Sequence, residues 1–365
     1  MKYIRVMLEL ITLAVLLPFN RLISKKYYIF YSPLGYVGNV RYVFEYFEKK
    51  GEHVIFITND HLKKSYFSTL FKLIQGRYVF LTHGVGRLPF LFFLNQRVQL
   101  WHGLPIKKIL LDYRGDYQKS KYCFINVLLK KILKARINLF YNYLVTSDSE
   151  LGTHLSQSMA LPSQKVLKLG TPSIAKSYEY YALNKGNSAG TSSIYKVLYM
   201  PTWRDGSSTV SEIIDSFISE HAFFKENNIE IFCKLHPLDI KYNRTKEIPV
   251  NGNIHLLEQS EDIVKLLSGF DCLITDYSSV CFEFFPQQKP CIFYVPDLID
   301  YFNKREAYIN VEHFYSGQPR DIQMLKNTLL ESRNGRCKNI DYKFYCGDNT
   351  SALENIYNKF TNCKL

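Results

Sequence analysis

Short apolar runs alternate with amphipathic stretches along most of the chain, and this alternation predicts its secondary structure. In the first half, the apolar runs have the length and the β-branched or aromatic content of buried strands. They cover residues 27–31, 53–58, 77–82, 97–101 and 143–146. A loop over 32–39 and helical periodicity over 40–49 separate the first two runs, so the chain begins with a βαβ unit. This order is typical of a doubly wound parallel sheet.

The alternation restarts after a polar, turn-rich segment at residues 184–193. Strands are then expected at 196–200, 230–234, 254–256, 272–275 and 291–294, and helices at 211–225, 263–267 and 280–285. We therefore predict an α/β, GT-B-like fold, in which two Rossmann-like domains face a central cleft. The expected divisions are a basic amphipathic leader (1–26), an N-terminal acceptor-side domain (27–183), a linker (184–195) and a C-terminal donor-binding domain (196–365).

Composition narrows the class of protein. The chain has 365 residues, of which 47% are hydrophobic and 22% charged, as expected of a packed globular protein. Its eight cysteines have no metal-ligand spacing. The chain also lacks both the G-x-G-x-x-G dinucleotide fingerprint and the G-x-x-x-x-G-K-[ST] phosphate loop, which argues against nicotinamide and ATP chemistry.

Positive charge is concentrated in the first half of the chain. Residues 1–200 carry 28 Lys and Arg against 10 Asp and Glu, whereas residues 201–365 carry 18 against 23. Such a basic half favours an anionic partner, either nucleic acid, lipid headgroups or a phosphate-rich acceptor. No nucleic-acid motif occurs, so we expect no nucleic-acid partner.

Two segments suggest an anionic membrane surface as that partner. The uncharged stretch Leu10–Asn20 is too short to span a bilayer and is flanked by basic residues, so it is either an interfacial helix or a buried N-terminal helix. The segment Lys119–Arg136 alternates lysines with apolar residues and predicts a basic amphipathic helix. We accordingly expect peripheral attachment to the cytoplasmic face of the cell membrane.

Two histidines have matching settings in the two halves. His102 and His236 each follow a short strand-like run, and Gly103 and Pro237 stop those runs. The imidazoles should therefore lie where buried strands end, which is where open α/β sheets bind ligands. Three other histidines lack such a setting and are expected to be structural: His83, His154 and His313.

The second half also contains a candidate phosphate site. The strand over 272–275 ends in Asp276, Ser278 and Ser279, and a helix is expected to follow, whose N-terminus would attract an anion. An ordinary helix cap is the alternative. Lys234 ends an earlier strand and would add a cation, and Glu283 is either a ribose ligand or a solvated acid.

Four linked motifs resemble those of the CDP-glycerol glycerophosphotransferase family of teichoic acid and capsule synthesis. They are Val98–Lys107 (VQLWHGLPIK), Leu198–Arg204 (LYMPTWR), Lys234–Pro237 (KLHP) and Thr275–Glu283 (TDYSSVCFE). The resemblance covers roughly residues 27–310. It implies a GT-B fold and transfer of glycerol phosphate or ribitol phosphate from a CDP-alditol, with release of CMP. A lipid-linked glycan or polyol-phosphate acceptor and peripheral membrane attachment are also implied.

The resemblance further implies roles for individual residues. His102 would be the base that takes the proton of the acceptor hydroxyl, because an imidazole can accept a proton at cytosolic pH. His236 would act on the donor's phosphates. The remaining donor-side residues are Arg204, Lys234, Asp276, Ser278, Ser279 and Glu283, and the acceptor-side residues are Trp101, Gly103 and Lys107. No cofactor is expected, and no metal, because no carboxylate cluster is evident.

The chain departs from the family pattern at two positions. Leu104 stands where the family most often has Thr, which removes a hydroxyl beside the proposed base. Ser173 stands where the family tends to have Arg, so a phosphate contact is either lost or supplied elsewhere. Two other functions stay open: a GT-B glycosyltransferase with a nucleotide-sugar donor, and a non-catalytic membrane scaffold.

Overall fold

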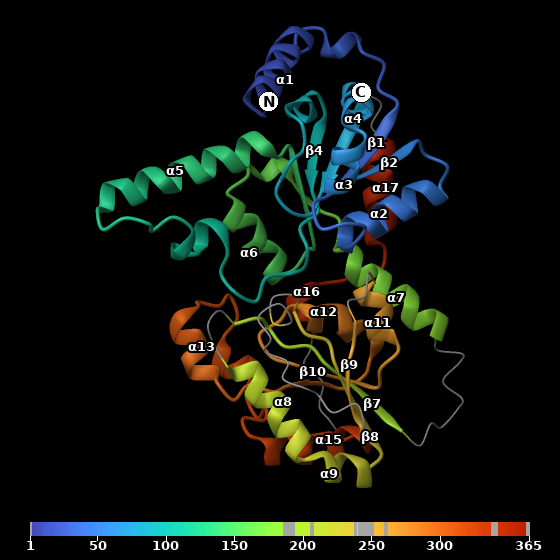
Figure 1. The fold of residues 1–365 in the computed structure, drawn as a ribbon, viewed down its shortest axis with the longest axis vertical. Coiled ribbons are helices and arrows are strands. Elements are labelled where there is room, and N and C mark those ends of the chain that lie inside the picture. Colours follow the sequence, from blue (N-terminus) through green and yellow to red (C-terminus); the bar gives the residue numbers. More distant parts are fainter. Residues whose placement is uncertain are drawn as a thin grey trace. The chain divides into compact units, whose positions relative to one another are not determined.

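In the computed structural model, the chain forms two compact units (Figure 1). The structure describes residues 2–184, 194–204, 208–236, 239, 252–258, 262–336 and 342–362. The first unit comprises residues 1–104, 109–175 and 343–365, and the second comprises 105–108 and 176–342. Most of the expected linker, residues 185–193, lies outside the described residues.

The first unit is built on a six-stranded parallel sheet, as expected from the apolar runs. The strand order is β2-β1-β3-β4-β5-β6. The strands are β1 (Tyr27–Ser32), β2 (Val54–Thr58), β3 (Gly76–Leu81), β4 (Gln96–Gln99), β5 (Tyr143–Thr146) and β6 (Val166–Lys168). Each neighbouring pair is parallel, so the carboxyl ends of all six strands lie along one edge.

Helices cover both faces of this sheet. They are α1 (Lys2–Leu16), α2 (Gly38–Lys49), α3 (Asn59–Lys64), α4 (Tyr66–Ile74), α5 (Cys123–Phe140), α6 (Glu150–Met159) and α17 (Ala352–Thr361). Short 3-10 turns lie at Asn20–Leu22, Phe90–Leu94 (η2), Leu110–Asp112, Arg114–Asp116 and Ser163–Lys165. One face packs into a core around Ile29, Val79 and Leu91, which are almost completely buried.

The C-terminal helix α17 belongs to the first unit, which differs from the expected boundary of a C-terminal domain over 196–365. Phe360 is buried, and its ring centroid lies 5.0 Å from that of Tyr78 and 5.2 Å from that of Phe80. Tyr357 packs on Phe47 of α2 at 5.2 Å. Without α2 and α17, the aromatic side chains on this face of the sheet would meet water, so the apolar stripe of α17 supplies the missing cover.

The second unit contains a five-stranded parallel sheet with the order β11-β10-β7-β8-β9. The strands are β7 (Tyr195–Tyr199), β8 (Ile229–Cys233), β9 (Ile254–Leu256), β10 (Cys272–Thr275) and β11 (Cys291–Phe293), close to the expected ranges. The described helices are α8 (Thr209–Ser219), α9 (His221–Glu226), α11 (Ile263–Ser268), α12 (Val280–Phe284), α13 (Leu298–Lys304), α14 (Val311–Phe314) and α15 (Ile322–Arg333). A 3-10 turn follows α12 at Phe285–Gln287. The helix expected over 211–225 forms two helices, because helical geometry is interrupted at Glu220.

Two further helices, α7 (Pro172–Asn184) and α16 (Tyr342–Cys346), contain the points where the chain changes unit. Residues 105–108 also belong to the second unit, although the residues on either side of them belong to the first. The expected domains are therefore each discontinuous in sequence. The apolar pattern cannot predict where the chain passes from one unit to the other. It indicates which face of a segment is buried, and it does not indicate which unit that face packs against.

The N-terminal leader has features of both expected alternatives, a buried helix and an interfacial helix. In α1, Leu13 and Leu16 pack against the core of the first unit, and the buried Glu9 accepts hydrogen bonds from the Tyr66 hydroxyl and from the amide of Phe90, the latter at 2.9 Å. The opposite face is exposed and apolar: Tyr3, Ile4, Met7, Leu8, Ile11 and Val15. The helix is therefore anchored on one side and leaves an apolar stripe on the other.

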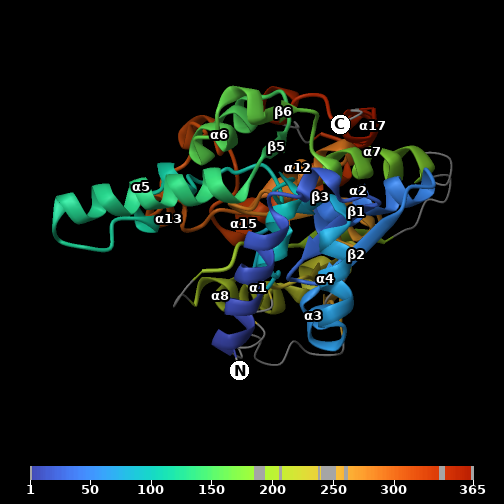
Figure 2. The ribbon, with the colours of Figure 1, turned by 90° about the horizontal axis from the view of Figure 1, so that it is seen from above.

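Helix α5 is the expected basic amphipathic helix, although it begins at Cys123. Ile137 is its one buried residue, and both views show it reaching away from the sheet of its own unit (Figures 1 and 2). Its exposed large apolar residues are Phe124, Val127, Leu128, Ile132 and Leu139. Among the described residues, no helix is both long enough and apolar enough to cross a membrane.

Candidate active site

The loop that carries His102 follows β4 and is held by two buried amides. Asn39, which is 1% exposed, donates to the carbonyls of Leu100 and Trp101 at 3.2 and 3.1 Å. The side-chain carbonyl of Gln99 accepts from the amide of Trp101 at 2.9 Å. Trp101 has φ +54°, a left-handed conformation that costs about 1–2 kcal/mol for such a residue. The amides thus hold the loop in a strained conformation that presents the next residue, His102.

His102 is oriented by a single backbone contact. Its Nδ1 lies 3.3 Å from the carbonyl oxygen of Thr82, and because a carbonyl only accepts, Nδ1 carries the hydrogen in the neutral ring. Nε2 then holds a lone pair. Burial lowers the pKa of His102, and the bond to Thr82 partly offsets this shift. At neutral pH the ring is therefore an uncharged base.

The faces of the His102 ring are covered, while the side chain as a whole is exposed. The centroid of Trp101 lies 4.7 Å from that of His102, and the centroid of His83 lies 4.6 Å from it with the planes only 7° apart. This arrangement reconciles an exposed side chain with a pKa lowered by burial, because the ring edge meets solvent and the faces do not. His83, which is expected to be structural, stacks on the proposed base.

Lys107, which is expected on the acceptor side, belongs to the second unit, whereas His102 belongs to the first. Its segment forms an antiparallel bridge with Ala307, and the amide of Tyr308 donates to the carbonyl of Ile106 at 2.8 Å. The Lys107 ammonium lies 5.9 Å from the centroid of Tyr301. Burial lowers its pKa to about 8, although the carboxylate of Asp276 raises it in part.

The two departures from the family pattern lie in well-packed places. Leu104 is buried at 1% exposure, so its side chain contributes to packing. The amide of Ser173 donates to the side-chain oxygen of Asn39 at 2.8 Å. The residue that stands in place of an arginine therefore supports the same asparagine that holds the His102 loop.

In the second unit, the candidate donor residues follow three adjacent strands. Arg204 comes after β7, Lys234 and His236 come after β8, and Asp276 comes after β10. Since β10, β7 and β8 are neighbours in a parallel sheet, these residues meet at one edge. The sequence motifs are thereby brought together as expected.

Arg204 is engaged by two carboxylates. Its Nε lies 2.7 Å from Asp297 Oδ2, its Nη2 3.0 Å from Asp297 Oδ1, and its Nη1 2.8 Å from Asp276 Oδ2. Burial alone would lower the pKa of Arg204, but these carboxylates hold it above its ordinary value. A guanidinium paired in this way orders the strand ends, and its contact with a donor phosphate stays a prediction.

Asp276 acts as the anchor between two strand ends. Its Oδ1 accepts from the amide of Thr202 at 2.8 Å and from the amide of Tyr277 at 2.5 Å. The Tyr277 hydroxyl in turn donates to Asp297 at 2.8 Å. The loops after β7 and β10 are therefore one hydrogen-bonded assembly.

The remaining donor-side residues surround this assembly. Lys234 is 5% exposed, and burial lowers its pKa; burial also lowers the pKa of the exposed His236, with Asp239 acting in the opposite direction. Ser278 and Ser279 are half-buried at the start of α12. This helix spans five residues, so its dipole is small and the hydroxyls and amides of the turn are the main anion ligands available there. Glu283 is buried within it.

Several residues of the site were not expected from sequence. They are Asn39, His83, Gln99, Asp297 and Tyr301. His83 carried a usable signal, because it follows β3 as His102 follows β4, and β3 and β4 are neighbours in the sheet. The other four residues contact segments that are distant in the sequence, and a local sequence pattern does not predict such contacts.

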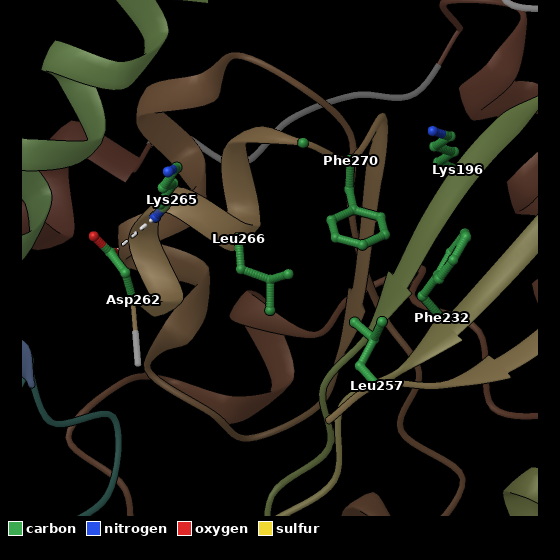
Figure 3. Close-up of a pocket in the computed structure, with 8 residues that line it drawn as sticks. Lys196, Phe232, Leu257, Asp262, Lys265, Leu266 and Phe270 are labelled. Carbon is green, nitrogen blue, oxygen red and sulfur yellow. Dashed lines mark hydrogen bonds between the residues drawn. The ribbon is translucent and has the colours of Figure 1, made fainter. Parts of the chain in front are cut away.

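A pocket of about 450 Å³ lies elsewhere in the second unit, beside β8 and α11 (Figure 3). Phe232, Leu257, Leu266 and Phe270 line it, and Asp262 accepts from the amide of Lys265 at 2.9 Å on its rim. None of the candidate site residues lines it. Within the described ranges, no group of three or more His, Cys, Asp or Glu side chains is arranged to hold a metal ion.

The sequence of this chain matches a known protein family. A family model described as CDP-glycerol:poly(glycerophosphate) glycerophosphotransferase matches residues 18–332. The teichoic acid glycerol-phosphate primase of Bacillus subtilis is 32% identical over 228 residues, which cover 58% of this chain and 54% of the primase. The teichoic acid ribitol-phosphate primase of Bacillus spizizenii is 26% identical over 265 residues, covering 67% and 63%. The chain thus spans between half and two thirds of these relatives.

Solved structures show the same fold. The wall teichoic acid polymerase TagF superposes with a TM-score of 0.68 at 19% identity, over 94% of this chain and 90% of that chain. The UDP-GlcNAc 2-epimerase of Neisseria meningitidis superposes with a TM-score of 0.55 at 12% identity, over 92% and 99%. These similarities and the two parallel sheets confirm the expected GT-B-like class of two Rossmann-like domains.

Proposed function

Because the chain belongs to the CDP-glycerol:poly(glycerophosphate) glycerophosphotransferase family, we propose that it transfers glycerol phosphate or ribitol phosphate from a CDP-alditol. The acceptor is a membrane-linked glycan or polyol phosphate in teichoic acid or capsule synthesis, and CMP is released. The observation that carries the proposal is the orientation of His102, whose Nδ1 is engaged by Thr82 and whose Nε2 holds a lone pair.

The reaction follows from this orientation. His102 Nε2 takes the proton of an acceptor hydroxyl as its oxygen attacks the β-phosphorus of the CDP-alditol. The bond from that phosphorus to the oxygen shared with the α-phosphorus breaks, and its electron pair leaves on CMP. Positive and hydrogen-bonding groups at the strand ends of the second unit stabilise the charge on the leaving group. These groups are Lys234, His236, Ser278 and Ser279, and Lys107 of the same unit adds a cation near the carboxylate of Asp276.

The donor side does not rely on a metal in this proposal. The lysine ammonium groups, together with the hydrogen-bond donors beside them, supply the positive charge that a divalent ion provides in other phosphoryl transferases. Turnover should then persist in excess EDTA. Loss of turnover in EDTA, with recovery on adding a divalent ion, would contradict the metal-free mechanism.

Attachment to an anionic membrane surface is part of the proposal. The exposed apolar stripe of α1 and the exposed apolar and lysine side chains of α5 both lie in the first unit. Apolar side chains enter the headgroup region and lysines attract anionic lipids. The protein would then work peripherally at the cytoplasmic face of the membrane, where a lipid-linked acceptor is presented.

A donor panel tests the proposed reaction directly. The purified protein is incubated with CDP-glycerol, CDP-ribitol or UDP-sugars and with a membrane extract as acceptor, and the release of CMP or UDP is measured. We expect CMP release from a CDP-alditol that requires the extract. Release of UDP without release of CMP would instead support a nucleotide-sugar glycosyltransferase, and no turnover of any donor would support a scaffold.

A further inference from the structure

His83 forms a second imidazole beside the proposed base. Its ring centroid lies 4.6 Å from that of His102, and the two planes differ by 7°. The two residues follow β3 and β4, which are neighbouring parallel strands, so both lie on the ligand-binding edge of the first sheet. Gln99 also donates to the carbonyl of His83 at 3.3 Å, which ties both strand ends to one buried side chain.

One residue, Thr82, fixes both rings. Its carbonyl oxygen lies 3.3 Å from Nδ1 of His102, and its hydroxyl lies 2.9 Å from Nδ1 of His83. Both Nδ1 atoms are therefore engaged by Thr82, which leaves the two Nε2 atoms for a ligand. Within the part of the chain that the structure describes, neither Nε2 has a hydrogen-bond partner.

The pair accommodates one proton at most near neutral pH. Burial and, to a smaller extent, the neighbouring His102 together lower the pKa of His83 to about 4. When His102 becomes charged, His83 therefore stays neutral and keeps its ability to hydrogen-bond. A neutral ring stacked on an imidazolium also stabilises the charge through its π face.

We propose that Nε2 of His83 binds the hydroxyl next to the one that His102 deprotonates, so that the site selects an acceptor with two neighbouring hydroxyls. This inference rests on the proposed function. Neighbouring hydroxyl oxygens lie about 3 Å apart, and hydrogen bonds of about 2.8 Å to each can reach two nitrogens separated by about the distance between the stacked rings. His102 takes the proton of the attacking hydroxyl, and His83 transfers no proton and fixes the direction of attack.

Histidine spectra test the inference without turnover. In the full-length protein labelled with ¹⁵N-histidine, glycerol 3-phosphate should shift the Nε2 signals of both His83 and His102. The phosphate monoester of propane-1,3-diol, which lacks the middle hydroxyl, should shift only the signal of His102. The inference would be overturned if the His83 signal shifted equally with both probes, or if it did not shift with glycerol 3-phosphate.

Kinetics with matched acceptors provide the second measurement. A lipid-linked glycerol phosphate and its counterpart without the middle hydroxyl are compared with the CDP-alditol that the wild type uses. The wild type should prefer the acceptor with both hydroxyls about 10-fold in kcat/KM, as one hydrogen bond to a half-buried group implies. His83→Phe, which keeps a flat ring over His102, should bring the ratio of kcat/KM for the two acceptors close to one.

The controls separate folding, the inference and the proposed function. His154→Gln alters a half-exposed histidine of α6 in the same unit and should retain the full preference. If His83→Phe still had a 10-fold higher kcat/KM for the acceptor with both hydroxyls, the proposed role of His83 would be contradicted. A wild type that releases no CMP from any CDP-alditol would refute the proposed function, and the histidine spectra would then still decide whether His83 binds a diol.

Discussion

At the scale of single residues, the contacts of His102 suit it to the proposed role of a base. The carbonyl of Thr82 fixes its tautomer, and stacking with Trp101 and His83 fixes its plane. The two stacking residues are themselves held, Trp101 by Asn39 and Gln99 and His83 by Gln99. Such an exposed ring edge supports chemistry without contributing much to the core, so its removal should affect rate far more than stability.

We predict that His102→Ala lowers kcat by about 100- to 10,000-fold, the range typical of general base catalysis. The KM for the CDP-alditol should stay within about 2-fold, because residues of the second unit bind the donor in the proposed reaction. The change in melting temperature should be small, and CMP release by initial-rate assay together with calorimetry measures both effects. An equal loss of rate in His154→Gln would point to a general disturbance of the first unit.

Lys107 has a pKa of about 8 because it is largely buried. It is charged below that pH and becomes neutral above it, so affinity for the anionic donor should fall as pH rises through 8. Lys107→Gln should bind CDP-glycerol more weakly and show no such fall. Isothermal calorimetry between pH 6.5 and 9.5 measures this, and Lys108→Gln, which breaks an exposed pair with Glu306, is the matched control.

The same pKa makes a prediction about stability. A lysine whose pKa is lower in the folded state than in the unfolded state binds fewer protons when folded, so stability rises with pH between about 8 and 10.5 and is reduced below 8. Lys107→Met should therefore raise the free energy of unfolding at pH 7, by up to about 3 kcal/mol. Urea unfolding at pH 7 and pH 10 tests this. A variant that is less stable than the wild type at pH 7 would show that the ammonium is net stabilising.

At the scale of elements, α17 decides how the first unit is closed. Phe360 is 1% exposed and meets three aromatic rings of the sheet. Phe360→Ala should cost about 3–5 kcal/mol of unfolding free energy through the lost burial and the cavity left behind. Phe344→Ala, at a residue that is 64% exposed, should cost less than about 0.5 kcal/mol. Equal midpoints of urea unfolding for the two variants would contradict the assigned packing of α17.

Apolar patterning predicted the strands well because each is a short buried run of β-branched or aromatic residues. The core residues Ile29, Val79 and Ile274 fall where the sequence places them. Strand β6 (Val166–Lys168) was not predicted, because three residues at a sheet edge with an exposed lysine carry little apolar signal. The unit to which α17 belongs could not be predicted, since its stripe would suit either sheet.

The candidate site was predictable as a set of strand ends but not as a set of contacts. His102, His236 and Asp276 lie where strand-end reasoning expects them. The position of Lys107 in the second unit depends on backbone bonds to residues about 200 positions away. The engagement of Arg204 by Asp297 depends on a carboxylate outside the motifs. Long-range pairings of this kind leave no local trace in a sequence.

At the scale of the whole molecule, the uneven charge of the chain makes a prediction about membranes. The excess of 28 basic over 10 acidic residues in positions 1–200 coincides with the unit that exposes apolar side chains on α1 and α5. Each lysine near an anionic surface contributes about 1 kcal/mol, and salt screens this attraction within about 10 Å at 0.1 M. Apolar insertion, in contrast, resists salt.

Binding to vesicles should therefore have two separable parts. The protein should sediment with vesicles that contain phosphatidylglycerol and much less with pure phosphatidylcholine, and 0.5 M salt should weaken binding without abolishing it. Ile4→Ser combined with Ile11→Ser should remove most of the salt-resistant part. Ile299→Ser, at an equally exposed position of α13 in the second unit, should leave binding unchanged. If the α1 variant sediments like the wild type, the exposed stripe of α1 faces a protein partner or solvent, and charge alone carries the protein to the membrane.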